Sequence, residues 1–422
     1  MKKIILFSIV LIFSFSINAQ EKKDSTKANA PIKGKIYFAP LPAIAANPTF
    51  GVLYGVAAST NVFMGDPKTT RMSTSLGSAT YSTNKQLMFT FKSNVYLEND
   101  DWILMGDWRF FDTSQPTFGL GTGPQSSKLV ADSLEYEGGF NKPLDEAQMM
   151  EFKYLRFHET VFKKVKTNFY LGAGYHLDWH YDINDNLLVL NPEDGSDPTL
   201  TSHYTYSKAY DFDPEGYILS GISVNALYDS RDNAAAPYKG QYALVTFKMN
   251  PTFLGSTKGS STLWLEYRKY FSTSKKHPQN VIGVWAYGNF ETSGHLPYLD
   301  LPALGWDQFG RSGRAYTQGR FRGQNLMYGE VEYRFRIAGI KSNPDFFGAV
   351  IFANATTASR EEYTDKNNFN YHGIKLFHYV EPAIGVGLRI MVSKVTRTNL
   401  SIDYAIGKYG SQGFFLNFNE SF

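Results

Sequence analysis

Four charged residues alternate along one short segment near position 330. In the run LMYGEVEYRFRI, from 326 to 337, Glu330, Glu332, Arg334 and Arg336 occupy every second position. Carboxylates and guanidinium groups form strong, directional, charge-assisted contacts. Successive side chains of a β-strand point to opposite faces, so a strand here places all four charges on one side.

The other face of the same segment is apolar and aromatic. It carries Met327, Val331, Tyr333, Phe335 and Ile337. A soluble sheet would bury one of these faces and leave the other in water. A strand with lipid outside and a wet lumen inside accommodates both. The segment therefore predicts one strand of a transmembrane β-barrel.

Similar alternation recurs along the chain, with turn signals between the segments, and predicts about sixteen strands. The fold class expected is all-β, a transmembrane antiparallel up-and-down β-barrel. The first strand is the weakest, because it holds Pro40 and Pro42. The predicted strands lie near 36–44, 51–63, 71–80, 86–98, 102–111, 148–158, 167–179, 217–229, 241–249, 261–270, 280–291, 326–337, 346–356, 384–390, 400–406 and 413–422.

The connections between these strands alternate in length. Long ones fall at 112–147, 180–215, 292–325 and 358–377, and tight ones lie between them. Short periplasmic turns and long external loops are typical of outer-membrane barrels. A wrong strand count would have scrambled this alternation.

The N-terminus is typical of a secretory signal peptide. Lys2 and Lys3 precede an apolar run, and cleavage is expected after Ala19. We expect a signal peptide at 1–19, a short polar segment at 20–34 and an outer-membrane barrel at 35–422. The predicted location is the outer membrane of a Gram-negative bacterium.

Composition excludes several classes of function. There is no cysteine, so no lipid-modified N-terminal cysteine, disulfide framework or thiolate metal site is available. A net charge of +3 over 422 residues gives no case for nucleic acid as a partner. Aromatic residues make up 16% of the chain although its mean hydropathy is negative, as alternating faces require.

The last predicted strand ends on an aromatic residue. Phe414, Leu416, Phe418 and Phe422 are expected to share one face. This ending resembles the C-terminal signal by which outer-membrane proteins are recognised for insertion.

Three features together resemble the BamA/TamA-type bacterial surface antigen superfamily of outer-membrane assembly and translocation barrels. Phe321-Arg322-Gly323, at the end of the sixth external loop, is similar to the family's VRGF/Y signature. The run GEVEYR at 329–334 resembles the strand after that loop, and NALYDSRDNAAAPYKGQY at 225–242 resembles a strand-turn-strand element of these barrels. The likeness covers most of the mature chain.

The resemblance implies that Arg322 folds back into the lumen and pairs with an acidic residue of the barrel wall. Where the family has Phe-x-Asp-x-Gly, this chain has FANAT, so uncharged Asn354 stands in place of the aspartate. Glu330 and Glu332 are the alternative partners, because both are expected to face the lumen. The resemblance also implies a weak seam between the first and last strands.

The function expected from this resemblance is outer-membrane protein assembly, insertion or translocation. The alternative is a passive channel or structural barrel that has lost this activity. The expected partners are outer-membrane lipid and a separate periplasmic or assembly-machinery protein, because the 20–34 segment cannot hold the POTRA domains that usually accompany such barrels.

No cofactor, metal ion or catalytic residue is predicted. His176, Asp178 and His180 alternate on one strand and could share a face, but polar residues are ordinary near the end of a barrel strand. The Asp-rich stretches of the 180–215 loop lack EF-hand spacing. A lipolytic barrel enzyme is the third hypothesis, but Ser312 lacks the nucleophile-elbow spacing.

Overall fold

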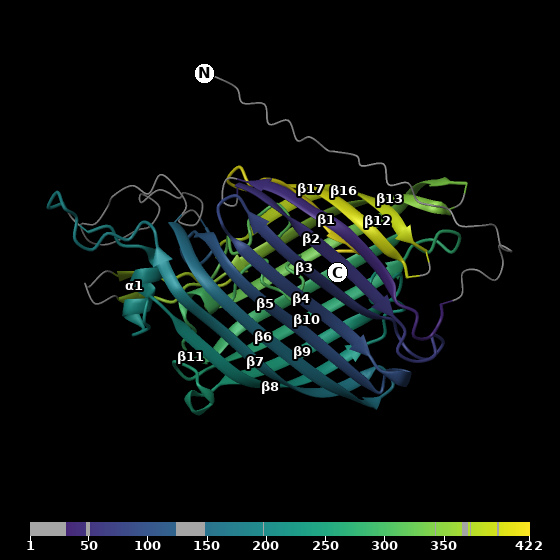
Figure 1. The fold of residues 1–422 in the computed structure, drawn as a ribbon, viewed down its shortest axis with the longest axis horizontal. Helices are drawn as coiled ribbons and strands as arrows, with labels where there is room; N and C mark the ends of the chain where they lie inside the picture. Colours follow the sequence, from purple (N-terminus) through teal and green to yellow (C-terminus); the bar gives the residue numbers. More distant parts are fainter. Residues whose placement is uncertain are drawn as a thin grey trace, which may run out of the picture. The chain divides into compact units, whose positions relative to one another are not determined.

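Consecutive strands pair antiparallel with one another to form a 16-stranded sheet in this computed structural model. The structure describes residues 31–47, 51–123, 148–196, 198–341, 343–364, 370–371, 373–394 and 396–422. The sheet coils on itself with tilted strands, and the short helix α1 (Ser202–Ala209) lies at one end of it (Figure 1). The predicted fold class, strand number and alternation of loop lengths are confirmed.

The strands are longer on average than the sequence pattern predicted, because pairing extends into residues whose alternation is imperfect. A separate two-stranded hairpin, β14 with β15, lies in the connection after β13. The elements are β1 (Tyr37–Asn47), β2 (Gly51–Val62), β3 (Ser73–Ser82), β4 (Leu87–Tyr96), η1 (Glu98–Asp100), β5 (Trp102–Thr117), β6 (Gln148–Lys166), β7 (Phe169–Asp185), α1 (Ser202–Ala209), β8 (Tyr217–Asp229), β9 (Gly240–Asn250), η4 (Thr252–Leu254), β10 (Ser260–Ser272), β11 (Val281–Gly294), η5 (Tyr298–Asp300), β12 (Asn325–Ile340), β13 (Asn343–Ala358), β14 (Tyr363–Thr364), β15 (Asn370–Tyr371), β16 (Glu381–Ser393), β17 (Thr398–Gly407) and β18 (Gln412–Phe418).

β12 has an apolar outer face and a charged inner face, as the alternation predicted. Val331 is 47% exposed and Ile337 is 53% exposed, whereas Glu330, Glu332 and Arg334 are buried on the inner side. An exposed apolar side chain beside a buried charged one is the reverse of a soluble sheet, and it is the arrangement of a strand between lipid and a polar lumen. Within the described residues no helix is long and apolar enough to span a membrane.

The first strand is more regular than its sequence suggested. β1 pairs with β2 without interruption, from Tyr37 opposite Asn61 to Asn47 opposite Gly51. Proline has no N–H to donate to a neighbouring strand. A central strand has a neighbour on each side, whereas an edge strand tolerates proline where the missing N–H would face away from its single neighbour. Pro40 and Pro42 therefore fit β1 because β1 is an edge.

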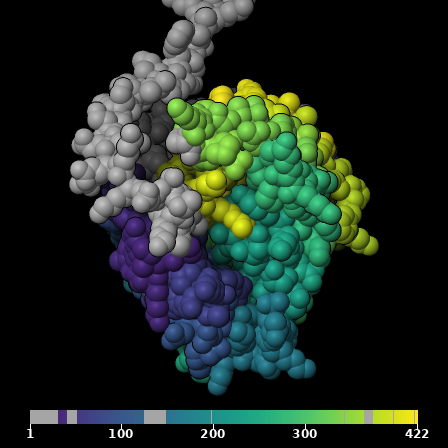
Figure 2. Space-filling model, turned by 90° about the vertical axis from the view of Figure 1, so that its right-hand side faces the viewer, coloured from purple at the N-terminus to yellow at the C-terminus, as the bar shows by residue number. Residues whose placement is uncertain are grey.

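The sheet has two ends, β1 and β18, and no hydrogen-bonded pairing joins them within the described residues. β18 is seven residues long and pairs only with β17. In the end view opposite α1, the yellow C-terminal part of the chain reaches toward the centre, between the violet and teal parts of the ring (Figure 2). The barrel therefore has a seam.

The C-terminal residues only partly follow the predicted face. Phe414 and Leu416 point outward, with 76% and 57% of their surface exposed. Phe422 does not share that face, because Asn419 adopts a left-handed backbone (φ 66°) that ends the alternation. Phe422 is instead buried inside, with its ring 5.4 Å from that of Trp285. Phe418 stands opposite Leu400 in the ladder, and its side chain lies outside the described part of the chain.

The expected signal peptide at 1–19 also lies outside the described residues, as does most of the polar segment at 20–34. Their assignment stays a prediction.

Two adjacent residues of β9 test the assignment of faces. Val245 is 43% exposed on the outer side, and Thr246 lines an inner cavity of about 260 Å³. We expect Val245→Arg to destabilise the folded barrel by about 2–4 kcal/mol, because it places a charge in lipid, whereas Thr246→Arg has room and polar neighbours inside. Urea unfolding of both variants in lipid vesicles measures the difference. Equal destabilisation would contradict the assignment.

Candidate functional site

The connection between β11 and β12, residues 295–324, folds into the interior of the barrel. Its aromatic and leucine side chains pack in the two main apolar clusters of the lumen, and Tyr298, Leu304, Tyr316 and Phe321 are all buried. These side chains lose contact with water by moving inward, so the sequence of this loop favours a path through the barrel rather than outside it.

Polar contacts tie the loop to the wall on the side of β4 and β5. Gln308 Nε2 donates to the carbonyl of Gly106 at 3.1 Å, and Arg109 donates to the carbonyl of Asp307 at 3.2 Å. At another point, Arg311 Nη1 donates to the carbonyl of Glu420 at 2.5 Å. The loop therefore crosses the lumen and contacts segments that are far apart in the sequence.

Arg314 is the residue of this loop with the most charged partners. Its Nη1 lies 2.7 Å from Asp403 Oδ2 on β17, and its Nη2 lies 2.8 Å from Glu332 Oε2 on β12. Nη2 also donates to Glu330 Oε1. The guanidinium side chain is only 2% exposed, so three carboxylates surround a cation that water scarcely reaches. Contacts of this kind fix both position and orientation.

Neighbouring groups on β13 hold the same arginine from a third side. The guanidinium carbon lies 3.4 Å from the ring centre of Phe352, which is a cation–π contact. Asn354 Nδ2 donates to the main-chain oxygen of Arg314 at 3.1 Å. Burial alone lowers the pKa of Arg314, but the three carboxylates outweigh burial and hold this pKa well above its ordinary value. Arg314 is therefore a permanent cation inside the barrel.

The network continues from Arg314 toward the C-terminal residues. Asp403 also accepts from Arg389 Nη1 at 2.5 Å, and Arg389 Nε lies 2.7 Å from Glu420 Oε2. Arg334, which pairs with Glu332, donates to the main-chain oxygen of Phe422 at 2.8 Å. The buried charged members are Arg314, Glu330, Glu332, Arg334, Arg389, Asp403 and Glu420. The inward-turned tail and the loop thus share carboxylates and guanidinium groups.

The backbone beside Arg314 is strained in a way that positions it. Ala315 has φ 101°, a conformation that favours glycine. The next residue, Tyr316, anchors the turn, because its hydroxyl donates to the carbonyl of Pro382 at 2.6 Å and accepts from Lys408 N at 3.0 Å.

The predicted lock residue, Arg322, occupies a different position. It is buried, but its Nη1 donates to the carbonyls of Tyr298 and Leu299, at 3.0 and 2.5 Å, and so it braces the loop against itself. The predicted pairing of Arg322 with Glu330 or Glu332 is wrong, because Arg314 occupies that position. Burial lowers the pKa of Arg322 below its ordinary value.

The residues on either side of Arg322 have packing roles. Phe321 is fully buried, with its ring 4.9 Å from that of Tyr316. Gly323 passes so close to the next connection that a Cβ there would lie 1.9 Å from the carbonyl oxygen of Ser359. Only glycine fits this approach.

A signal for Arg314 was present in the sequence. Arg314-Ala315-Tyr316 has the same order of arginine, small residue and aromatic residue as the VRGF/Y signature. Arg314 lies eight positions before Arg322, the arginine that the sequence analysis had matched to the signature. Arg389 and Asp403 lie in the predicted strands 384–390 and 400–406 and alternate there with apolar residues, so strand alternation places both side chains on the inner face. Alternation does not say which inward charges meet.

The other sequence candidates do not come together as a site. His176, Asp178 and His180 all face the interior, but Asp178 accepts from Arg156 at 2.8 Å and His180 lies 3.2 Å from Asp300. Within the described residues, no group with metal-ligand geometry includes them.

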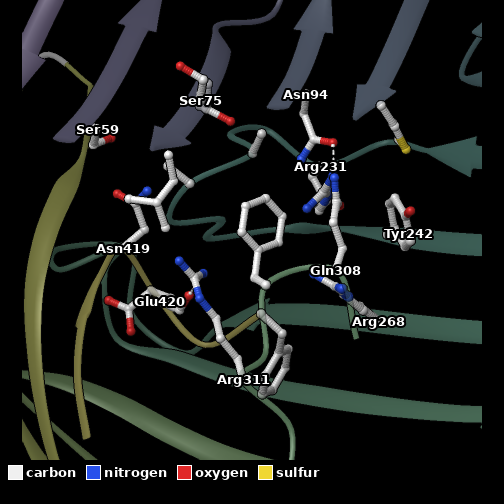
Figure 3. Close-up of a pocket in the computed structure, with 17 residues that line it drawn as sticks. Ser59, Ser75, Asn94, Arg231, Tyr242, Arg268, Gln308, Arg311, Asn419 and Glu420 are labelled. Carbon is white, nitrogen blue, oxygen red and sulfur yellow. Dashed lines mark hydrogen bonds between the residues drawn. The ribbon is translucent and has the colours of Figure 1, made fainter. Parts of the chain in front are cut away.

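A smaller pocket lies next to the C-terminal residues. It has a volume of about 50 Å³, and Figure 3 shows Arg231, Arg268 and Arg311 around it together with Asn419 and Glu420. These arginines add to the positive charge that surrounds the inward-turned tail.

Comparisons with known proteins agree with this architecture. The Omp85 superfamily domain matches residues 63–422. BamA from Haemophilus ducreyi lacking POTRA domains 1–3 has a similar structure, with 14% identity and a TM-score of 0.50, over 91% of this chain and 68% of that one. CdiB from Acinetobacter baumannii has 10% identity and a TM-score of 0.48, over 91% of this chain and 59% of that one. A search of curated proteins gave no match.

Substitution of the two arginines separates their roles. We expect Arg314→Gln to destabilise the barrel by about 3–5 kcal/mol, because it leaves buried Glu330 without a cation and removes one of the two cations beside Glu332 and Asp403. Arg322→Gln removes hydrogen bonds to carbonyls and is expected to cost about 1–2 kcal/mol. Urea unfolding in vesicles, with protease sensitivity of the loop, measures both.

A double variant provides the control. Adding Glu330→Gln to Arg314→Gln removes the unpaired buried carboxylate. The loss of unfolding free energy in the double variant should therefore be smaller than the sum of the losses in the two single variants. Strict additivity would argue against the ion-pair network.

Proposed function

The chain belongs to the Omp85 superfamily, and from this we propose that it assembles or translocates other proteins at the outer membrane of a Gram-negative bacterium. The superfamily match covers most of the chain. The barrel is an integral outer-membrane protein. The proposal concerns what its seam and its internal loop do.

The open seam is the observation that carries the proposal. β1 and β18 each present an edge without a hydrogen-bonded partner among the described residues. Unpaired N–H and C=O groups at a sheet edge are a template on which another extended chain can add as a strand. A barrel that only had to be stable would close this edge. The seam therefore supports a role in which a client strand pairs with the barrel wall.

The loop held by Arg314 supports the same role from inside. It crosses the lumen and is anchored on β12 and β17 through Glu332 and Asp403. Such a loop obstructs the passage of solutes through the lumen and ties β17, the neighbour of the edge strand β18, to β12. We propose that it keeps the barrel impermeable while the seam admits a client.

The expected partners follow from this role. Clients and a separate periplasmic or assembly-machinery protein would meet the barrel at the seam and at the end opposite α1. The proposal includes no catalytic step. The hydroxyl of Ser312 contacts Asp307 Oδ1 at 2.6 Å and Tyr287 Oη at 3.0 Å, which supports a structural role for this serine.

Stapling the seam tests the proposal. The chain has no cysteine, so a pair can be introduced cleanly: Leu416→Cys on β18 is combined with a cysteine at successive positions of β1, and the pair that forms a disulfide is used. In a strain lacking the native chain, we expect the disulfide to abolish complementation, measured as the abundance of outer-membrane barrels and surface proteins. Reductant should restore it, because reduction frees the seam.

A second staple serves as the matched control. Ser78 and Thr90 stand opposite each other in the paired strands β3 and β4, with their hydroxyl oxygens 2.6 Å apart. The Ser78→Cys, Thr90→Cys pair should leave complementation unchanged. If the seam staple forms and the outer membrane is unaffected, the seam is not where the protein acts.

The alternative of a passive channel makes a different prediction. In planar bilayers we expect the native barrel to conduct poorly and Arg314→Gln to raise its conductance, because the loop loses its anchor and leaves the lumen. A steady open pore that is the same in both proteins would favour the channel.

A further inference from the structure

Three residues with metal-binding side chains meet at the external base of the internal loop. Glu291 lies near the end of β11, His295 begins the loop, and Glu361 lies in the connection after β13. One candidate ligand atom from each lies within 4.8 Å of the others. None of these three residues belongs to the Arg314 network.

The backbone around the cluster is built to hold these groups together. Gln324, the last residue of the loop, accepts from Glu291 N through its main-chain oxygen at 3.0 Å. Its side-chain Oε1 accepts from Glu361 N at 3.1 Å. One residue therefore fixes both carboxylate-bearing positions.

Glu291 is buried and held in position, whereas the half-buried His295 has an unsatisfied ring nitrogen. The Glu291 side chain is only 5% exposed, and its Oε2 accepts from Leu296 N at 2.8 Å. The ring of His295 packs on that of Tyr210, with centroids 4.0 Å apart. His295 Nδ1 is buried and has no hydrogen-bond partner among the described residues, although Glu291 Oε1 lies 3.2 Å away.

We propose that Glu291, His295 and Glu361 bind a divalent transition-metal ion of the Zn²⁺ type. Zn–N and Zn–O bonds of about 2.0–2.2 Å at tetrahedral angles place neighbouring ligand atoms about 3.3 Å apart. The separation between His295 Nδ1 and Glu291 Oε1 matches this value. Glu361 is exposed, so its side chain can close the remaining distance, and water supplies the fourth ligand.

The ligand set selects against other common ions. Calcium takes six to eight oxygen ligands and magnesium prefers an octahedral shell of oxygen, whereas imidazole nitrogen with two carboxylates suits zinc. A bound ion would join the start of the 295–324 loop to the connection after β13. It would hold the loop entrance from outside, independently of Arg314.

Metal binding to the purified barrel tests this site. The protein, prepared without a polyhistidine tag and stripped with a chelator, is titrated with ZnCl₂ by calorimetry. We expect one ion per chain, and we expect Glu361→Gln and His295→Gln each to weaken binding at least about tenfold. Glu362→Gln, at the adjacent exposed position, is the matched control and should bind as the native chain does.

Cobalt gives a second readout that does not depend on affinity alone. Co²⁺ in the site should show the visible absorption of a tetrahedral complex, and Glu361→Gln should lose it. Heat-modifiable migration on gels checks that every variant is folded. Absence of binding, or binding that the ligand variants and Glu362→Gln affect equally, would overturn the proposal and leave the proposed function of the seam untouched.

Discussion

A guanidinium group buried inside the barrel is the constraint on which the rest of the structure depends. Arg314 is cut off from water, so its charge is tolerable only beside Glu330, Glu332 and Asp403. Those carboxylates are themselves buried and need a cation. Neither side can leave without stranding a buried, unpaired charge, and this mutual need holds a 30-residue connection, residues 295–324, across the lumen.

The same network reaches the C-terminal segment. Asp403 contacts both Arg314 and Arg389, and Arg389 contacts Glu420 in the inward-turned tail. A movement of the tail toward β1 would therefore withdraw a carboxylate from Arg389 and change the charge balance around the loop. The seam and the loop are linked through shared ion pairs. Opening of the seam would therefore change the contacts that hold the loop in the lumen.

The apolar surface of the protein follows from its surroundings. Outward-facing residues such as Val331 and Leu416 are exposed in large part, while the charges lie within. In lipid this arrangement satisfies both faces of each strand. It also explains why the strong internal ion pairs are needed, because the lumen, and not the outer surface, is where polar residues must find partners.

The sequence by itself determined the period-two faces, the number of strands, the alternation of loop lengths and the inward direction of Glu330, Glu332, Arg389 and Asp403. These are local properties, set by the alternation of side chains along each strand. Only the tertiary structure decided that Arg314 and not Arg322 meets the carboxylates, because that choice depends on the path of a long loop through space. It also decided that Phe422 turns inward, since one left-handed residue, Asn419, interrupts the alternation that the sequence pattern had extended to the end.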